Sequence, residues 1–368
     1  MLLVTFHGGA APGINNVYCY DTTTNKLETD QALRQIDASK LSELRGMIYE
    51  NGCLYVANGG KNVSNVLTFQ HQGKEKPDHF AYVADFVDDT VSSKGHFETS
   101  IAHPFSLAFD GAGFAYVPNQ DTNVVARVTV SANFQTGTLN KGCQSTYLIG
   151  QENNLCPAGN CVFLDGTFVA SQTGTLHGVE VAATDVPSQY GGLEVSPTTG
   201  KVENSVRDVV IANGMLFVCD EPALVIRMYA LPNGDYLGAS CALPDKPTHL
   251  TVQNGGLYAS AGAGLYWSPL PASSTSPTLS LQGVLTAPSK NEIGGISFNQ
   301  SNGSATAYAC LQLGKGGADG GSIQAYNVTQ AASGTAPVFT AGAVIASSSN
   351  DDFKDTPEFV LYLPDTLT

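Results

Sequence analysis

One unit recurs along the chain and constrains its fold more than any other feature. It consists of an apolar strand-like run, an Asn-Gly or Asp-Gly dipeptide, and a second run rich in Tyr, Val and Ala, as in LRGMIYENGCLYVANGG from Leu44. Asn-Gly and Asp-Gly tolerate the positive φ of a tight turn, so each copy predicts a β-hairpin. The turn glycines lie about 40–60 residues apart, which is typical of a repeated four-stranded unit. They are Gly52, Gly111, Gly166, Gly214, Gly255 and Gly303.

A third and a fourth strand-like run follow most of these hairpins, for example NVLTFQ and then HFAYVADF. Each unit therefore predicts four antiparallel strands, which we call A to D from the centre outward. Units of this kind arranged radially around a channel make an all-β propeller. Blades are expected to begin near residues 44, 104, 160, 206, 248 and 294.

The two ends of the chain supply one further blade. PEFVLYLP from Pro357 is expected to be an A strand, and LLVTFHG at the N-terminus a B strand. NVYCYDT would then form strand C, and residues near 31–36 strand D. A blade built from both ends leaves no exposed sheet edge at the closure. We therefore predict a single domain, residues 1–368, folded as a seven-bladed β-propeller whose last blade, near 357 joined with 1–40, is closed by both termini. A six-bladed ring with the termini packed outside is the alternative.

The net charge of the chain indicates which classes of binding partner are expected. The chain carries 17 Lys and Arg against 32 Asp and Glu, a formal net charge of −15. Nucleic acids and anionic membranes bind clustered basic residues, so neither is an expected partner. No stretch approaches the ~20 apolar residues of a membrane span. We expect a monomer that binds a small molecule. The absence of a visible targeting signal favours a cytoplasmic location, or a secreted one if the N-terminus is processed.

One unit resembles a known repeat. FSLAFDGAGFAYVPNQDTNVVARVTV, after His103-Pro104, is similar to the repeat of the YVTN and lactonase-like propellers, and LYVANGGKNVSNVLTF matches it more loosely. The resemblance covers about two blades and implies the fold alone, because such repeats serve lactonases, lyases, electron-transfer proteins and binding scaffolds. The matching residues are His103, Pro104, Asp110, Gly111, Tyr116, Val117, Asn119, Asn123 and Val124.

Residues that enter strand A and leave strand B are expected to gather at the mouth of the channel, where loops meet on a rigid scaffold. The candidate catalytic residues there are His7, His103, His249, Arg45 and Arg207. The candidate substrate-binding residues are Asn58, Asn119, Gln172, Asp220, Glu221, Glu292 and Gln312. Glu358 also enters an A strand. This polar rim is suited to a hydroxylated or carboxylated small molecule.

Each candidate also has a structural interpretation. His103 and His249 can bond the backbone of a neighbouring blade, and His7 can lie on an exposed loop. Asn58 and Asn119 can close turns through their side-chain amides. The remaining alternatives are an Arg207–Asp208 ion pair between blades, solvated Asp220 and Glu221, and a turn-capping or metal-binding Glu292.

Two chemistries fit the rim. A histidine can act as general acid or base while an arginine holds a carboxylate or enolate, which suits a lactonase or a lyase. Alternatively, Asn and carboxylate oxygens can hold Ca²⁺ or Mg²⁺ that polarises a lactone carbonyl, as in six-bladed lactonases. We therefore expect a small-molecule-binding propeller of lactone hydrolase or lyase type. The alternatives are a protein that binds a metabolite without turnover, as propellers of specialised metabolism do, and a protein-interaction scaffold.

Overall fold

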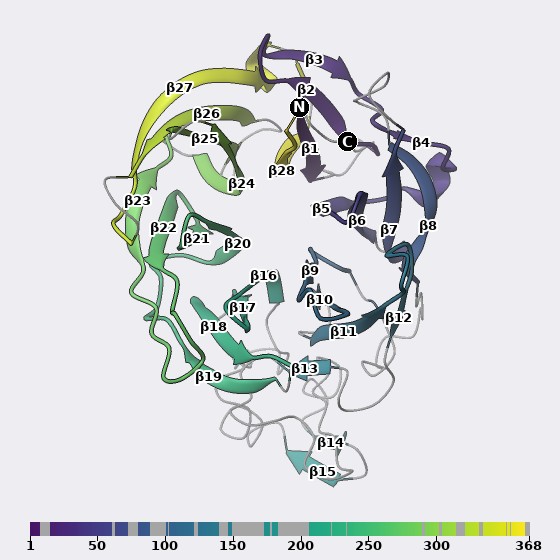
Figure 1. Cartoon of the computed structure of the whole chain (residues 1–368), viewed down its shortest axis with the longest axis vertical. Helices are drawn as coiled ribbons and strands as arrows, with labels where there is room; N and C mark the ends of the chain where they lie inside the picture. Colours follow the sequence, from purple (N-terminus) through teal and green to yellow (C-terminus); the bar gives the residue numbers. More distant parts are fainter. Residues whose placement is uncertain are drawn as a thin grey trace.

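The strands form a ring of four-stranded sheets around a central channel (Figure 1). The structure is a computed structural model. It describes residues 1–7, 15–60, 63–72, 80–88, 101–139 except 102 and 121–123, 146–148, 173–176, 179–182, 206–330 except 222, 233, 289–290, 302–303 and 314–320, and 334–364 except 351 and 354. Within these residues, helix is confined to two short 3₁₀ turns, η1 (Ala38–Lys40) and η3 (Ser348–Asn350). Of the described helices, none has the length and hydrophobicity needed to span a bilayer.

The ring holds six blades, and in five of them the strands follow chain order from the channel outward, whereas blade I begins with the last strand of the chain. Blade I is β28 (Thr356–Tyr362), β1 (Leu2–His7), β2 (Tyr18–Asp21) and β3 (Lys26–Thr29). Blade II is β5 (Leu44–Glu50), β6 (Cys53–Gly60), β7 (Val63–His71) and β8 (Phe80–Asp88), joined by β4 (Leu33–Arg34). Blade III is β9 (Ala108–Phe109), β10 (Phe114–Asn119), β11 (Val124–Val130) and β12 (Gly137–Leu139), with β13 (Thr146–Leu148) also paired to β11. Blade IV is β16 (Val206–Ala212), β17 (Met215–Asp220), β18 (Val225–Ala230) and β19 (Asp235–Ala239). Blade V is β20 (Pro247–Gln253), β21 (Gly256–Ala261), β22 (Gly264–Pro269) and β23 (Gln282–Thr286). Blade VI is β24 (Asn291–Ser301), β25 (Ser304–Leu313), β26 (Gly321–Thr329) and β27 (Val338–Ser347).

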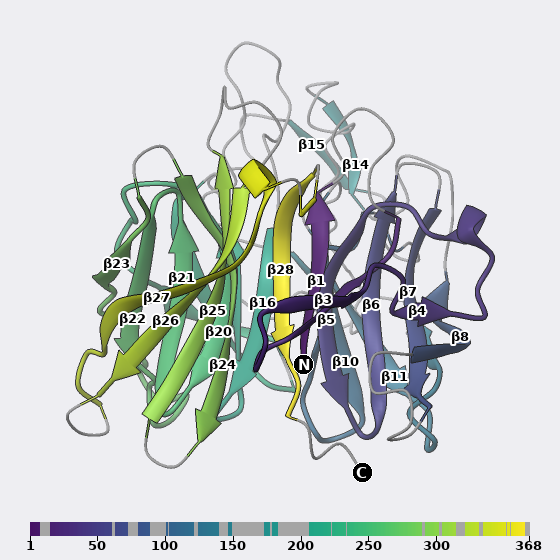
Figure 2. The same cartoon turned by 90° about the horizontal axis from the view of Figure 1, so that it is seen from above.

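The number of blades corrects the main prediction of seven and matches the number in the alternative of six, but the two ends of the described chain lie within a blade and not outside the ring. Strands β9 and β10 of blade III contact β16 of blade IV directly, so no blade lies between them. The blade expected near residue 160 falls largely outside the described residues. Its described strands, β14 (Thr173–Leu176) and β15 (Val179–Ala182), pair with each other and lie outside the ring in both views (Figures 1 and 2). A hairpin pattern reports local strand pairing, and it does not show whether the hairpin joins the ring.

Blade I contains both ends of the described chain. Strand β28 pairs antiparallel with β1 from Leu2–Tyr362 to His7–Thr356, and the two run side by side along the channel (Figure 2). The outermost strand of this blade is β3, which ends before the predicted residues 31–36. Leu33 and Arg34 instead pair in parallel with β8 of blade II. Because one strand can bond to either neighbour, the apolar pattern alone did not assign this segment to its blade.

The inner hairpins confirm the predicted turn chemistry. Asn51-Gly52 has φ values of 51° and 79°, and Asn213-Gly214 has 51° and 72°. Two successive positive φ values define the type I′ turn that matches the twist of paired strands. At Gly111 of blade III, the carboxylate of Asp110 accepts hydrogen bonds from Ala112 N and Phe114 N instead.

The hydrophobic core lies between neighbouring blades. Side chains alternate along a strand, so the two faces of each sheet bury different residues. In β6, Leu54 and Val56 pack with blade I, whereas Cys53 and Tyr55 pack with Val117 and other residues of blade III. Because both faces are buried, the second strands read as nearly continuous apolar runs, which is why they were visible in the sequence.

The inner strand of every blade carries a β-bulge at the same position. In blade II, Leu44 pairs with Asn58 and Met47 pairs with Val56. Two residues of the inner strand therefore lie opposite one residue of its neighbour. Equivalent register shifts occur in the other five blades. A bulge bends its strand and re-aims the side chains beside it. We call the two residues at each shift the bulge pair; the pairs are Arg45-Gly46, Phe105-Ser106, Arg207-Asp208, Thr248-His249, Gly294-Gly295 and Glu358-Phe359.

The bulge pair of blade II requires glycine at Gly46 because adjacent blades approach closely there. A Cβ at Gly46 would lie 2.7 Å from Ser106 Cβ and 2.9 Å from the carbonyl oxygen of Phe105. Backbone and Cβ atoms cannot rotate away, so Gly46→Ala is expected to destabilise the protein by about 1–3 kcal/mol through overpacking. Gly283→Ala is the matched control, because the nearest atom to its Cβ would be at an ordinary 3.8 Å. Urea unfolding of both variants checks this; equal stabilities would contradict it.

Candidate active site at the mouth of the channel

A buried arginine organises one wall of the channel. The Arg45 side chain is 2% exposed; its Nη1 donates to Glu358 Oε2 at 2.5 Å and its Nη2 to Glu43 Oε2 at 2.8 Å. Burial alone would lower the pKa of Arg45, but the two carboxylates raise it. Burial alone would raise the pKa of Glu358, yet Arg45 and His7 hold it well below its ordinary range. Blades I and II thus share a charged pair that is buried and ionised.

The structure brings His7 and His103 onto this arginine. His7 Nδ1 contacts Arg45 Nη1 and lies 3.5 Å from Glu358 Oε2, while half of the His7 side chain remains exposed. His103 Nε2 lies 3.4 Å from both Arg45 Nη2 and Glu43 Oε2. We call Arg45, Glu358, Glu43, His7 and His103 the acid–base wall.

His103 is held in an unusual backbone conformation. Its φ is +55°, a region that non-glycine residues occupy rarely and that is often found at functional sites. Its backbone N–H donates to Ser64 Oγ, and its carbonyl accepts from Gln120 N. A Cβ on Gly59 would lie 2.6 Å from Cδ2 of the ring, so this glycine makes room for the imidazole.

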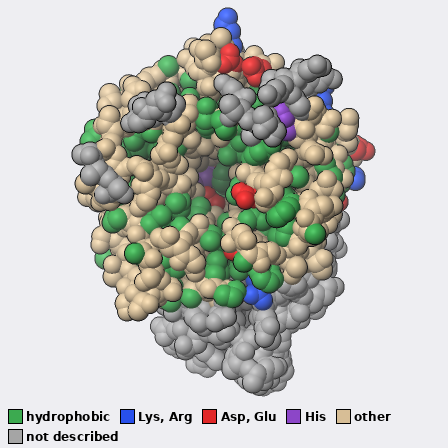
Figure 3. All heavy atoms as spheres, in the orientation of Figure 1, with side chains coloured by type: hydrophobic (Ala, Val, Ile, Leu, Met, Phe, Trp, Pro, Cys, Tyr) green, Lys and Arg blue, Asp and Glu red, His purple; other side chains and the backbone are tan. Residues whose placement is uncertain are grey.

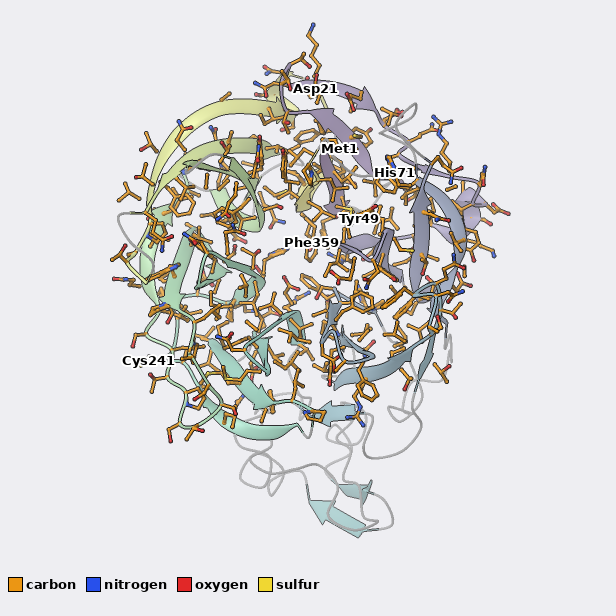
Figure 4. All side chains as sticks on the ribbon, viewed as in Figure 1. Met1, Asp21, Tyr49, His71, Cys241 and Phe359 are labelled. Carbon is orange, nitrogen blue, oxygen red and sulfur yellow. The ribbon has the colours of Figure 1, made fainter. Side chains whose placement is uncertain are left out.

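His249 occupies a different environment. It is 3% exposed, and its ring centre is 4.4 Å from that of Phe359 and 5.5 Å from that of Phe105. The two phenylalanine rings are 5.1 Å apart, and Phe359 lies at the centre of the ring of blades (Figure 4). Three side chains from blades I, III and V therefore meet across the channel, and we call them the aromatic floor. Burial lowers the pKa of His249 to about 4, so its imidazole is neutral at pH 7.

The opposite wall carries a second buried cluster. Arg207 Nε donates to Glu221 Oε2 at 2.8 Å, Arg207 Nη1 contacts Gln120 Oε1, and Lys246 Nζ donates to Glu221 Oε1 at 3.0 Å. Burial alone would raise the pKa of Glu221, but these two cations lower it. The Arg207 guanidinium also lies over the ring of Phe105, 5.2 Å from its centre. We call Arg207, Glu221, Lys246 and Gln120 the cationic wall.

Three of the predicted binding residues bond within their own blades. Asn58 is buried and donates to Lys40 O and Asn65 Oδ1, and Asn119 donates to Val117 O. Asp220 forms a buried ion pair with Arg227 at 2.6 Å. These contacts match the structural interpretation of Asn58 and Asn119, and they show Asp220 buried rather than solvated.

The remaining predicted residues bond to groups outside the two walls or lie outside the described chain. Glu292 and Gln312 face each other across β24 and β25, and Gln312 donates to Pro357 O at 3.2 Å. Gln172 and the expected blade entrance at residue 160 lie outside the described residues. Within the described part of the chain, no group of three or more His, Cys, Asp or Glu is placed to hold a metal ion, so the Ca²⁺ or Mg²⁺ site has no candidate ligand set there.

Sequence reasoning did not select several residues of the site. Phe105 and Phe359 resemble ordinary core residues, and Glu43, Gln120 and Lys246 lie one position before or after the strands. The useful signal was the bulge register, because aligning the bulge pairs shows which residues share one level of the channel. Figure 3 shows that the centre of the ring is hollowed on the face it presents, with acidic and histidine side chains visible inside.

Asp208 makes contacts in three blades. Its contribution to folding stability changes with pH in the opposite direction to that of His249. It accepts hydrogen bonds from Val209 N and from Leu250 N of the next blade, both at 2.8 Å, and it is also bonded by Ser106 of the preceding blade. Burial raises the pKa of Asp208 to about 6 from its ordinary 3.8. Between pH 3.8 and pH 6, Asp208 is protonated in the folded state and ionised in the unfolded state. Its contribution to the free energy of unfolding therefore increases as the pH falls from 6 to 3.8. His249 acts oppositely, because the unfolded state binds its proton below pH 6.5.

Removing the carboxyl group of Asp208 is expected to reveal the pH dependence of stability that comes from His249. In Asp208→Asn, the free energy of unfolding should fall by about 3 kcal/mol more than in the wild type between pH 6.5 and 4, since only His249 still titrates there. Urea unfolding at both pH values measures this difference. A difference between the two proteins that does not change with pH would contradict it.

Comparisons with known proteins support the fold and give no family. No family model matches the chain, and no curated protein matches its sequence. Among solved structures, it is similar to a protein from Lactobacillus plantarum (12% identity, 94% of this chain and 82% of that chain, TM-score 0.52). It is also similar to a candidate 6-phosphogluconolactonase from Bacteroides uniformis (10% identity, 93% and 81%, TM-score 0.52) and to a chain of a nidogen/laminin complex (8% identity, 98% and 97%, TM-score 0.50). At these identities the similarity shows a β-propeller fold and no activity.

Proposed function

We propose that this propeller binds a small hydroxylated or carboxylated molecule at the mouth of its channel and hydrolyses a lactone there. One observation carries the proposal: the half-exposed imidazole of His7 is held by a buried ion pair of Arg45 and Glu358. A histidine oriented through one ring nitrogen by a charged partner is the arrangement that general acid–base catalysis uses.

The geometry supports a two-step hydrolysis. Glu358 Oε2 lies 3.5 Å from Nδ1 of His7, so the tautomer with its proton on Nδ1, directed at this carboxylate, would leave Nε2 unprotonated and able to take a proton. A water molecule would attack the lactone carbonyl carbon while its proton passes to Nε2. The tetrahedral intermediate would then expel the ring oxygen, which takes the proton back from His7, and a hydroxy acid is released. His103, 17% exposed on the same wall, would stabilise the developing oxyanion.

The aromatic floor would support the body of the ligand. Phe105 and Phe359 are 1% and 7% exposed, so they would close the channel on one side of a bound ligand and keep water from that side. His249, neutral and enclosed by these rings, would contribute to this floor and not to proton transfer at neutral pH. The three histidines that were predicted as catalytic residues would therefore have different roles.

A hydrolysis assay tests the proposal directly. Purified protein is incubated with a panel of neutral and acidic γ- and δ-lactones, and acid release is followed with a pH indicator. We expect turnover of at least one lactone by the wild type and by His71→Asn, whose site lies in blade II away from the channel centre (Figure 4), but not by His7→Ala. The assay is repeated with EDTA, because catalysis through His7 needs no divalent cation. Equal turnover by His7→Ala, or loss of turnover in EDTA, would overturn this mechanism.

A binding measurement on the same panel separates the alternative function. If lactones or the corresponding hydroxy acids shift the melting temperature without being consumed, the protein is a metabolite-binding propeller. Because folds of this kind occur in a candidate lactonase and in a protein complex alike, the fold does not choose between these outcomes.

A further inference from the structure

The cationic wall differs in charge from the chain as a whole. Two cations, Arg207 and Lys246, share the single carboxylate of Glu221, which leaves a formal charge of +1 on a chain with a net charge of −15. Glu221 is 7% exposed, whereas the Arg207 and Lys246 side chains are 17% and 52% exposed. The buried carboxylate thus holds two cations that both remain partly exposed.

Both cations retain donors after these contacts. Arg207 uses Nε on Glu221 and Nη1 on Gln120, and within the described chain no hydrogen bond uses its Nη2. An ammonium group has three hydrogen-bond donors, and Lys246 Nζ uses one of them in its bond to Glu221. Three contacts, from Glu221, from Gln120 and from the ring of Phe105, fix the plane of the Arg207 guanidinium. A donor that is already oriented loses little freedom when it binds a ligand.

The acid–base wall offers no comparable surplus of positive charge. Arg45 is paired with two carboxylates, Glu358 and Glu43, which gives a formal charge of −1 when the histidines are counted as neutral. An anionic group would be repelled there and attracted to Arg207 and Lys246. Phe105 lies between the two arginines, with the Arg45 guanidinium 5.8 Å and that of Arg207 5.2 Å from its ring centre. The charged walls therefore flank one aromatic ring.

We infer that the cationic wall is a subsite for an oxyanion, a carboxylate or a phosphate group of the ligand, bound by Arg207 and Lys246. This inference deepens the proposed function, on which it rests: the substrate is an anionic ring compound. Its charged group lies against blades IV and V, and its reacting carbonyl lies against blades I and II. The separation of anion and reaction centre orients the ligand across the aromatic floor.

Anion binding is tested first without turnover. Inorganic phosphate and acetate are each titrated into the intact protein and followed by isothermal calorimetry and by NMR. We expect saturable binding of at least one anion that weakens as salt is added. Lys246→Gln and Arg207→Gln should each raise its Kd by about tenfold or more, as expected for loss of a charge-assisted contact. Lys26→Gln, which removes an exposed lysine on β3, should not change it. The anion that binds identifies the source as carboxylate or phosphate.

The outcomes separate this inference from the proposed function. Equal Kd values in wild type, Lys246→Gln and Lys26→Gln, or no binding of either anion, would overturn the subsite even if lactone hydrolysis depends on His7. Lys246 is half exposed, so its variant keeps the test valid if Arg207→Gln fails to fold. If the assay detects lactone turnover, Lys246→Gln should raise KM for acidic lactones and leave KM for neutral lactones unchanged. Equal rises for both classes would count against it.

Discussion

Replacing Arg45 with methionine is expected to lower the free energy of unfolding by about 3–5 kcal/mol, because it leaves a buried carboxylate without its counter-charge. Glu358 has a side chain that is 8% exposed, and its ionised form depends first on Arg45. Methionine keeps most of the volume of the arginine stem, so loss of packing adds little. The variant should also become less sensitive to acid. In the wild type, stability is lost as the pH falls below the ordinary pKa of a glutamate, since only the unfolded state takes up that proton.

A double variant distinguishes the lost charge from lost packing. Arg45→Met with Glu358→Leu removes both charges from the same buried place, and it should recover most of the stability lost in the single variant. Urea unfolding of the two single variants, the double variant and the wild type gives the coupling energy between the residues. Simple additivity of the two single effects would show that the ion pair does not act as a unit.

Replacing His7 with alanine is expected to lower kcat for lactone hydrolysis by about 10²–10⁴-fold, the range usual for a positioned acid–base group. KM should change little, because the floor and the cationic wall bind the ligand. Stability should also change little, since half of the His7 side chain is exposed. The kinetic effect is measured on the best lactone of the panel, alongside thermal unfolding of the same samples.

Glu358→Gln is the partner variant for His7. It removes the charge beside Nδ1 while keeping an amide of the same shape, so kcat should fall because the imidazole loses the carboxylate that orients it. A kcat equal to that of the wild type would mean that Glu358 does not position His7.

The repeat made most of the fold predictable. An Asn-Gly turn has a local cause in positive φ, and a second strand buried on both faces has a clear composition, so both could be recognised without long-range information. The number of blades could not be derived in this way. Whether a hairpin joins the ring depends on packing between sheets, and Leu33-Arg34 shows that even a short strand can pair with the blade next to the one expected.

The site was predicted less completely, for a physical reason. The positions of His7, His103, Arg45 and Arg207 followed from their place at strand ends. The sequence could not show that Asn58 and Asn119 would satisfy the backbone of their own blades, or that His249 would be enclosed by phenylalanine rings. Such contacts depend on the angle at which six sheets meet, and the bulge in each inner strand sets where its side chains point.

The closure of blade I also has a consequence for when the site can form. Glu358 lies on β28 and His7 on β1, so two groups that contact the same arginine are separated by nearly the whole described chain. Bringing them together has the largest loop-closure cost in the fold and is expected late in folding. The five other blades can associate earlier, but Arg45 then lacks its main carboxylate. Completion of the ring and assembly of the acid–base wall would thus be a single event.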